Sequence, residues 1–456
     1  MDIEFIKKYE TRAPRYTSYP PANLFNSSVN NDVYKEQITI SNSQNPQNIS
    51  LYVHIPFCPQ LCNFCGCTTF FNSDKTRLNR YVSALLTEID TVSALIDRNR
   101  SVTQVHWGGG TPNALDFSII KQIMDKFRSV FKFAPNAEIA MECNPAYMDF
   151  ADIDNYASLG FNRLSLGIQD FDQNVLKNIH RQPSKHPVNE LIAYMHRLGM
   201  KGINLDLVYG LPGQTPESFT AAAQKAADCD ADRIVTFPYA HVPWVKPAQK
   251  ALEALGLPDA DQKLHAFVSA NQALTSAGYK FIGMDHYCKP DDALAIASQN
   301  GNLKRNFQGY CTAETTGQVY GFGATSITQL HSGYIQNIKN PDKYIETIET
   351  QHLAVERGYI LNSQEIMVRE AINELMCNGL LDFNQCAQKL NVAPADIIAA
   401  TGYSPEKFQP FVKDGILSIT DHCLTLRPDA FLAVRNIAVL LDPMMKDNGN
   451  MYSKTI

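Results

Sequence analysis

Four cysteines fall within ten residues near the start of the chain. They are Cys58, Cys62, Cys65 and Cys67, spaced C-x3-C-x2-C-x-C, and they directly follow a β-rich run at residues 51–55. Such closely spaced thiols at a strand end favour a metal or cluster site over a packed core, because thiolates bind soft metals. Tetrahedral zinc usually takes two separated C-x2-C pairs or a pair plus histidines, and bacterial ferredoxins use C-x2-C-x2-C. Neither pattern is present here.

The spacing C-x3-C-x2-C resembles that of radical S-adenosylmethionine (SAM) enzymes, and an aromatic residue, Phe64, stands before the third cysteine. In those enzymes three thiolates bind three irons of a [4Fe–4S] cluster. The amino and carboxylate groups of SAM chelate the fourth iron. Four buried free thiols or a zinc knuckle could also account for the cysteines, and the spacing favours the cluster over both.

The composition is that of an ordinary globular protein. The chain has 456 residues, of which 45% are hydrophobic and 19% charged, so it can form a large core and a second domain. The formal net charge is -6, which gives no indication of a nucleic-acid partner or an anionic membrane surface.

The remaining cysteines indicate a reducing compartment. The chain has 11 cysteines, and those outside the first group show no disulfide-framework spacing. The first twenty residues lack the apolar region of a secretory signal, and no apolar run approaches the roughly 20 residues that span a bilayer. We therefore expect a cytoplasmic protein with no membrane segment.

Six β-rich runs alternate with amphipathic helical stretches. We expect strands at 51–55, 104–107, 138–143, 163–168, 203–209 and 233–240, and helices that include 78–96, 115–131, 216–229 and 259–277. This alternation predicts an α/β fold with a parallel sheet and right-handed crossovers. Because six units are too few for an eight-stranded barrel, we expect a curved partial (β/α)6 barrel.

Polar or glycine residues follow each expected strand. The run GGGTP occupies 108–112, and Glu142, Gln169, Asp206 and Ala240 stand in or just after the later strands. Parallel sheets place their sites at the carboxyl ends of the strands, so these residues should share one rim. GGGTP does not match a dinucleotide fingerprint, but its glycines allow close approach of the backbone to a ligand.

The segments on either side of this region differ in character. Pro14, Pro20 and Pro21 favour an extended path near the amino end. Residues 364–378, 384–390, 405–413 and 429–441 are expected to be helical, with a hairpin between the last two. This resembles a winged helix, but it lacks a basic recognition face, so we interpret it as a cap or lid.

Longer stretches resemble the oxygen-independent coproporphyrinogen III oxidases, a radical SAM family of heme biosynthesis. These stretches are PRYTSYP, LYVHIPFC, the four-cysteine run, HWGGGTP, NRLSLGIQDF, NLDLVYGLPGQTPESF, GMDHY and RNFQGY. The resemblance implies a radical SAM partial barrel with a mostly helical C-terminal domain. It divides the chain into an N-terminal extension contributing to the substrate site (1–50), the barrel (51–280), a connecting segment completing the site (281–362) and the helical domain (363–456).

The resemblance also implies an activity. Enzymes of this family decarboxylate two propionates of coproporphyrinogen III to vinyl groups by means of a 5′-deoxyadenosyl radical from SAM, which gives protoporphyrinogen IX. The expected partners are this substrate and a low-potential electron donor such as flavodoxin or ferredoxin, and the expected state is a monomer. A tetracarboxylate substrate needs cations, and Arg15, Lys289 and Arg305 are candidates by position.

Site residues can be carried over from the family by matching motifs. Cys58, Cys62 and Cys65 would bind the cluster, and Cys67 would lie outside the ligand set. The expected SAM-binding residues are Tyr52, Phe64, Gly109, Gly110, Thr111, Glu142, Gln169, Arg181, Asp206 and Ala240. Those expected around a second SAM molecule are Phe307, Gln308 and Ile327.

A heme-chaperone relative, which binds heme without oxidase activity, would have a similar sequence. That group lacks the fourth cysteine and the RYTSYP segment, and this chain has both. A radical SAM enzyme that opens heme and a simple iron–sulfur electron carrier would also contain a cysteine group of this kind. The carrier would not need six strand ends arranged around one loop, so the sequence favours the oxidase.

Overall fold

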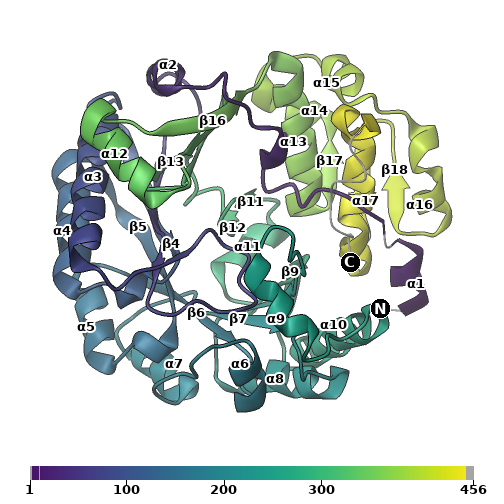
Figure 1. Cartoon of the computed structure of the whole chain (residues 1–456). Helices are drawn as coiled ribbons and strands as arrows, with labels where there is room; N and C mark the ends of the chain where they lie inside the picture. Colours follow the sequence, from purple (N-terminus) through teal and green to yellow (C-terminus); the bar gives the residue numbers. More distant parts are fainter. Residues whose placement is uncertain (1–2, 10, 448–456) are drawn as a thin grey trace.

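An open, curved sheet of twelve strands forms the centre of the molecule in the computed structural model (Figure 1). The structure describes residues 3–9 and 11–447. Residues 1–2, 10 and 448–456, which belong to the expected N-terminal extension and C-terminal domain, lie outside the described residues. The strand order is β16-β15-β14-β13-β1-β4-β5-β6-β7-β8-β10-β9.

Six parallel strands in the middle of this sheet are those predicted from the sequence. They are β1 (Ile49–Ile55), β4 (Ser101–Gly109), β5 (Lys132–Cys143), β6 (Arg163–Gln169), β7 (Asn204–Tyr209) and β8 (Arg233–Pro238). The helices on their outer side include α3 (Lys75–Ser93), α4 (Phe117–Val130), α5 (Phe150–Ser158), α6 (Gln173–Asn178), α7 (Val188–Arg197), α8 (Pro216–Asp228) and α10 (Ala260–Ser276) (Figure 1). The α/β class and the curved partial barrel are therefore confirmed.

The parallel strands are buried on both faces, which explains their nearly continuous hydrophobic sequences. Trp107 of β4 and Leu205 of β7 are fully buried within the main core. Helix α4 buries Ile120, Met124 and Phe127, whose spacing places one apolar stripe against the sheet. The helices lie on the outer face of this curved sheet, and each one carries the chain back to begin the next strand in the same direction (Figure 1).

Further strands extend the sheet beyond the six that were predicted. Strand β13 (Gln318–Phe322) lies parallel to β1, and β14 (Ile327–Leu330), β15 (Gly333–Asn337) and β16 (Val355–Ile360) follow antiparallel. At the other edge lie β10 (His286–Cys288) and β9 (Lys280–Gly283). A separate hairpin pairs β11 (Leu303–Asn306) with β12 (Gly309–Thr312). These strands have three to six residues each, too short for a clear periodic signal.

The C-terminal part is mostly helical and has its own core. Its helices include α13 (Ser363–Asn378), α14 (Phe383–Leu390), α15 (Pro394–Thr401), α16 (Gln409–Lys413) and α17 (Val434–Ala438). Strands β17 (Leu380–Asp382), β19 (Cys423–Leu426) and β18 (Leu417–Ile419) form a small antiparallel sheet. The expected helix at 405–413 is a short 3-10 turn followed by α16, and that at 429–441 is α17 between two 3-10 turns.

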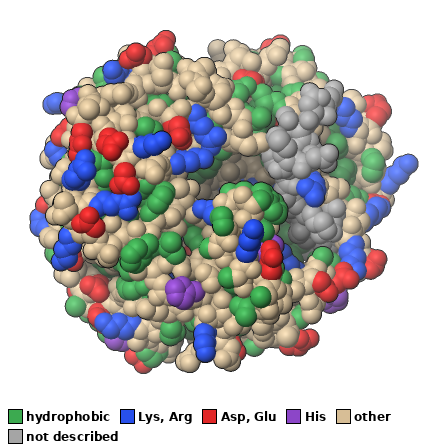
Figure 2. Space-filling model, in the orientation of Figure 1, with side chains coloured by type: hydrophobic (Ala, Val, Ile, Leu, Met, Phe, Trp, Pro, Cys, Tyr) green, Lys and Arg blue, Asp and Glu red, His purple; other side chains and the backbone are tan. Residues whose placement is uncertain are grey.

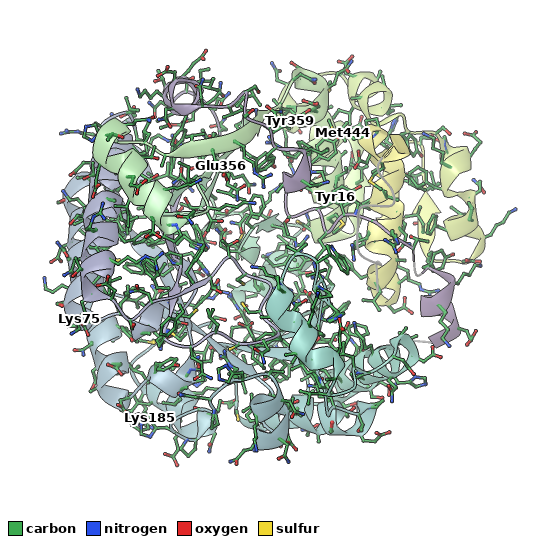
Figure 3. All side chains as sticks on the ribbon, viewed as in Figure 1. Tyr16, Lys75, Lys185, Glu356, Tyr359 and Met444 are labelled. Carbon is green, nitrogen blue, oxygen red and sulfur yellow. The ribbon has the colours of Figure 1, made fainter. Side chains whose placement is uncertain are left out.

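The amino-terminal segment ties the two parts together. It begins with α1 (Ile3–Lys8), runs extended beside the C-terminal helices and reaches α2 (Asn31–Ser41) near the far edge of the sheet (Figure 1). Its aromatic residues enter the C-terminal core. Tyr16 donates a hydrogen bond to Asp442 at 2.9 Å, and Figure 3 shows Tyr16, Tyr359 and Met444 around this junction. None of the helices in the described part of the chain combines the length and hydropathy needed to cross a membrane.

Candidate functional site

The four clustered cysteines lie on a loop at the carboxyl end of β1. The loop leaves from β2 (Phe57–Cys58) and returns through β3 (Phe70–Phe71), and the parallel pairing of these two short strands closes its base. Cys58 is buried, Cys62 and Cys65 are half-buried, and Cys67 is exposed; all four are free thiols. The loop therefore presents its sulfur atoms at the same end of the sheet as the strand-end residues.

Two polar side chains, one after β4 and one after α6, contact two of these cysteines. The Thr111 hydroxyl donates a hydrogen bond to Cys58 Sγ at 3.3 Å, and Arg181 Nη1 donates to Cys62 Sγ at 3.6 Å. Burial raises the pKa of the Cys58 thiol to about 11, and the Thr111 hydrogen bond opposes that rise. The hydroxyl and the guanidinium both favour the thiolate form that a metal needs.

Cys65 and Cys67 form a hydrogen-bonded pair. The bond from Cys67 lowers the pKa of Cys65, and the same bond raises the pKa of Cys67. Lys246 Nζ donates to the backbone carbonyl of Cys67 at 2.5 Å and helps to lower the pKa of Cys65. Of the two sulfurs, Cys65 is therefore better prepared to bind a metal.

The thiols of Cys58, Cys62 and Cys65 lie near enough to one another on this loop that the charges of Cys65 and Cys62 both act to raise the Cys58 pKa. A [4Fe–4S] cluster takes one thiolate for each iron that the protein binds. Three soft thiols on one loop are a donor set that such a cluster can use.

Glu142, at the end of β5, forms the anionic side of the opening. Its Oε1 lies 3.1 Å from His106 Nε2, and the backbone N–H of Gly109 donates to its Oε2 at 3.3 Å. Burial alone would raise the Glu142 pKa. The hydrogen bond from His106 and smaller effects outweigh burial, so the Glu142 pKa is lowered below its usual value. A β-carbon on Gly108 would lie 2.8 Å from Glu142 Oε1, so the glycine run makes room for this carboxylate.

Tyr52 is fixed beside this carboxylate. Its hydroxyl lies 3.0 Å from His54 Nδ1, and its ring stacks on His106 with centroids 6.1 Å apart. Burial lowers the pKa of His54 to about 4, so this histidine is neutral. His54 Nε2 lies 3.4 Å from the carbonyl of Thr68 and so connects the strand to the cysteine loop.

Gln169 and Arg181 meet beside Gly167 at the end of β6. Gln169 has φ 69°, and a β-carbon on Gly167 would lie 2.8 Å from Gln169 Nε2 and 3.0 Å from Arg181 Nη2. Arg181 also donates a hydrogen bond to the Gly167 carbonyl. Because Gly167 has no side chain, the Arg181 guanidinium can lie between the end of β6 and Cys62.

Asp206 and Ala240 complete the rim on β7 and after β8. Asp206 accepts hydrogen bonds from Ser165 at 3.0 Å and Asn204 at 2.7 Å, and burial raises its pKa to about 6. The Gln249 amide donates to the carbonyls of Ala240 at 3.2 Å and Phe64 at 3.0 Å. Gln249 thereby ties the cysteine loop to the segment after β8.

Phe307 and Ile327 come together on the other side of the opening. Both pack against the C-terminal core, and Phe307 meets the Tyr334 ring edge-on with centroids 6.1 Å apart. The backbone N–H of Gln308 donates to Asn306 within the β11–β12 turn at 2.9 Å. Phe307 and Ile327 therefore border the C-terminal core, whereas Glu142 stands at the end of β5.

Three arginines meet at the extended amino-terminal segment: Arg15 belongs to it, and Arg305 and Arg435 bind its backbone. Arg15 forms an ion pair with buried Asp285, and Arg305 donates a hydrogen bond to the Arg15 carbonyl. Arg435 donates to the carbonyls of Pro14, at 3.0 Å, and Ala13. Burial, followed by the charges of Arg15 and Arg305, lowers the Arg435 pKa to about 9. Cationic side chains from three distant parts of the described chain therefore meet at residues 13–15.

The expectation for Lys289 is wrong. Its ammonium contacts Asp230 at 2.6 Å and Asp232 at 3.7 Å, both of which precede β8. Lys289 therefore lies at the amino end of that strand, away from the rim. Lys289 follows β10, which runs antiparallel to β8, so the end of β10 lies beside the start of β8. The sequence did not predict this reversal of chain direction.

Sequence reasoning overlooked several residues of this site. Tyr52 and His106 are direct neighbours in the β1–β4 register, and His54 lies two residues after Tyr52. Strand alternation could have identified both histidines, since they share a face with Tyr52. Arg435 and Lys246 offered no such signal, because each reaches the site from a distant segment.

A curved parallel sheet with a loop of clustered thiols at its carboxyl rim is typical of radical SAM enzymes, and the sequence model of the Radical SAM superfamily matches residues 52–226. A relative from Synechocystis, named oxygen-independent coproporphyrinogen III oxidase, is 36% identical over 99% of this chain and 97% of its own length. A relative of the same name from Escherichia coli is 35% identical over 100% of this chain and 98% of its own length.

The same relationship holds in three dimensions. The solved structure of coproporphyrinogen III oxidase from Escherichia coli, described as a radical SAM enzyme, matches with a TM-score of 0.89 at 35% identity. The match covers 97% of this chain and 99% of that one. The chain belongs to the oxygen-independent coproporphyrinogen III oxidase family.

Proposed function

We propose that the chain converts coproporphyrinogen III to protoporphyrinogen IX by oxidative decarboxylation of two propionates without oxygen. The observation that carries this proposal is that the clustered thiols, Glu142 and Arg181 lie at one rim of the sheet. The relatives that match this chain over its full length support it. The proposal makes the protein an oxidoreductase of heme biosynthesis that depends on SAM and a [4Fe–4S] cluster.

In this proposal Cys58, Cys62 and Cys65 hold the cluster, and Cys67 stays outside its ligand set. When bound, the cluster and SAM supply the one-electron chemistry that removes hydrogen from a propionate before CO2 is lost. Glu142 accepts a hydrogen bond from the SAM amino group, and Arg181 pairs with the SAM carboxylate. The other side chains position and shield the reactants, so this step needs no acid or base from the protein.

The remaining rim residues give SAM its surroundings. Tyr52, Phe64, Gly109, Gly110, Thr111, Gln169, Asp206 and Ala240 would contact it. With the exception of buried Thr111 and exposed Ala240, these residues are half-buried, as residues that line an opening should be. Phe307, Gln308 and Ile327 would surround a second SAM molecule.

The four expected segments would cooperate in the reaction. Residues 51–280 carry the cluster and SAM, and the N-terminal extension 1–50 contributes Arg15 to the substrate site. The connecting segment 281–362 contributes Arg305. The domain 363–456 contributes Arg435 and covers the opening.

We place the protein in the cytoplasm as a monomer that receives electrons from flavodoxin or ferredoxin. All 11 cysteines are free thiols, which fits a reducing compartment.

The decisive experiment is anaerobic reconstitution with iron and sulfide, followed by incubation with SAM, coproporphyrinogen III and dithionite. Chromatography of the oxidised porphyrins should show first a monovinyl and then a divinyl product. Tight heme binding without any vinyl product would contradict the proposal and favour a heme chaperone.

The affinity for SAM should fall as the pH drops below 6. The Asp206 pKa is raised to about 6, and a cationic ligand binds the ionised carboxylate better than the neutral acid. If protonation blocks binding, the Kd rises about tenfold for each pH unit below this value. Isothermal titration across this range would measure the effect. An Asp206→Asn variant should bind weakly but with little of this pH dependence, and a wild-type Kd independent of pH would contradict the assignment.

Arg15→Gln and Arg305→Gln should each raise the KM for coproporphyrinogen III by about tenfold, because each removes a charge-assisted contact. Steady-state assays with dithionite as reductant would measure this. Lys289→Gln is the matched control, since Lys289 is paired with Asp230 at the other end of β8 and its loss should leave KM unchanged. Unchanged KM in both arginine variants would show that the substrate binds elsewhere.

A further inference from the structure

Lys339 is an exposed cation at the rim of the opening. It follows β15 by two residues and precedes α12 (Pro341–Gln351). Within the described part of the chain its ammonium makes neither a hydrogen bond nor an ion pair. Strand β15 runs toward the carboxyl end of β1, because it is antiparallel to β14, which is antiparallel to β13. Lys339 therefore lies at the same end of the sheet as the cysteine loop.

Two further cations lie near Lys339. Partial burial, followed by the positive charge of Arg357, lowers the pKa of Lys339, and Lys246 adds to this effect. The carboxylate of Glu356 opposes it without forming an ion pair among the described residues. Arg357 comes from β16, where it stands opposite Gln336 in the register. Three cations thus share this side of the rim with the acidic group of Glu356.

Neutral contacts hold two of these cations in place. Arg357 donates to the Gln336 side chain at 2.8 Å, and its guanidinium lies 6.0 Å from the centroid of the Phe25 ring. Lys246 reaches from the segment after β8 to the Cys67 carbonyl at 2.5 Å. Two held cations and Lys339 share one described carboxylate, that of Glu356, so the group keeps unbalanced positive charge whose mutual repulsion a solvated surface explains poorly. An anionic ligand would explain them.

The figures place this group beside a hollow. Figure 2 shows Lys and Arg side chains, with Asp and Glu side chains among them, on the rim of the central hollow over the region of β16 and α12. Figure 3 places Glu356 on the same side. The arginines around the amino-terminal segment lie near β9 and β10, at the opposite end of the strand order from β16. The opening is therefore bordered by positive charge from two sides.

We propose that Lys246, Lys339 and Arg357 form a second carboxylate-binding station, for the propionates that the substrate keeps throughout the reaction. The inference rests on the proposed function and assigns a task to residues outside the cofactor site. Coproporphyrinogen III has four propionates and its divinyl product has two, so two carboxylates persist on every species. A fixed station for them would hold the macrocycle while the other two propionates react in turn.

The test uses Lys339 variants, since this side chain is exposed and its loss should not disturb folding. Lys339→Gln should raise the KM for coproporphyrinogen III about tenfold, and Lys339→Glu should raise it further, with SAM affinity unchanged. Both variants should release more of the monovinyl intermediate, because a weaker anchor lets it dissociate before the second decarboxylation. Lys75→Gln is the matched control, because Lys75 is exposed at the start of α3 and lies at the periphery in Figure 3.

A gain of affinity provides a second variant that misfolding cannot imitate. Glu356→Gln removes the opposing charge and should tighten binding several-fold. Binding is followed by fluorescence titration with coproporphyrin III and with mesoporphyrin IX, a dicarboxylate. Both porphyrins should bind more weakly to Lys339→Glu, because the station recognises the carboxylates that the two share.

Three outcomes would overturn the inference. One is unchanged KM and unchanged porphyrin affinity in the Lys339 variants. Another is a defect seen with flavodoxin as donor but not with dithionite, which would assign the cations to an acidic redox protein. The third is an equal defect in Lys75→Gln. If the wild-type protein makes no vinyl product, the proposed function fails, while the titrations still decide whether Lys339 binds carboxylates.

Discussion

Replacing Cys62 with serine is expected to prevent assembly of the iron–sulfur cluster and to abolish activity. Serine has nearly the same size, but its hydroxyl does not ionise near neutral pH and is a poor ligand for iron. The Arg181 contact to Cys62 Sγ at 3.6 Å prepares this position for a thiolate. Iron and sulfide analysis after anaerobic reconstitution, together with the visible absorbance of the cluster, would measure the loss.

Cys67→Ser is the matched control, since Cys67 lies five residues away on the same loop. Its sulfur is the protonated partner in the hydrogen bond with Cys65, and its carbonyl is held by Lys246. The variant should therefore keep its iron and its cluster absorbance. If Cys67→Ser loses iron as Cys62→Ser does, Cys67 is a fourth ligand and the cluster has no open iron for SAM.

Replacing Glu142 with glutamine should weaken SAM binding by about 10- to 100-fold, the effect of losing a charge-assisted hydrogen bond. Glu142 is the ionised carboxylate at the rim, and its side chain is 45% exposed. Folding should be little affected, because the side chain is partly exposed and the amide oxygen of glutamine can still accept one of the two hydrogen bonds, from His106 or from the Gly109 N–H. Equilibrium dialysis with labelled SAM would measure the change in Kd.

Glu138→Gln is the matched control on the same strand. Glu138 lies four residues earlier on the same face of β5 and pairs with Arg163 at 3.0 Å, far from the rim. This change should lower the free energy of unfolding by about 3 kcal/mol, because it leaves a largely buried arginine, 16% exposed, without its counter-ion. SAM affinity should stay unchanged. Equal SAM affinity in the Glu142→Gln and wild-type proteins would remove Glu142 from the cofactor site.

The Glu138–Arg163 ion pair should also make the free energy of unfolding depend on pH. Burial alone would raise the Glu138 pKa, but the charge of Arg163 leads the effects that outweigh it. The Glu138 pKa falls to about 2, below its value in the unfolded chain. The stability that the pair provides is therefore present at neutral pH and is lost as the pH falls toward 2. Urea unfolding at several acidic pH values should show this loss in the wild-type protein and little of it in Glu138→Gln.

Most of the barrel could be predicted because its strands are continuous hydrophobic runs separated by amphipathic helices. The run at 203–209, for example, corresponds to β7, and the expected helix at 259–277 corresponds to α10. A strand and tight turn could be read from the sequence at 319–327, which overlaps β13, but the place of β13 to β16 in the sheet was not predicted. They are short, and they belong to the sheet only because β13 pairs with β1 from more than 260 residues away.

The same distinction applies to the site. The sequence by itself determined the thiol loop and which residues end the parallel strands. Chain direction is fixed in a parallel sheet, so the strand ends that carry Glu142 and Gln169 must share one edge, and Asp206 lies within the neighbouring strand β7, opposite Gly167. Whether these residues bind SAM stays a prediction that the variants above test.

Only the tertiary structure decided where the positive charge lies. Lys289 belongs to the amino end of β8, whereas Arg435 joins Arg15 across more than 400 residues of sequence. Lys339 and Arg357 meet because β15 pairs with β16. A cation on a loop carries no periodic signal, so its neighbours are set by packing between distant segments and not by local sequence. The cysteine loop could be predicted because its spacing is local; the surroundings that would bind a tetracarboxylate could not, because folding assembles them.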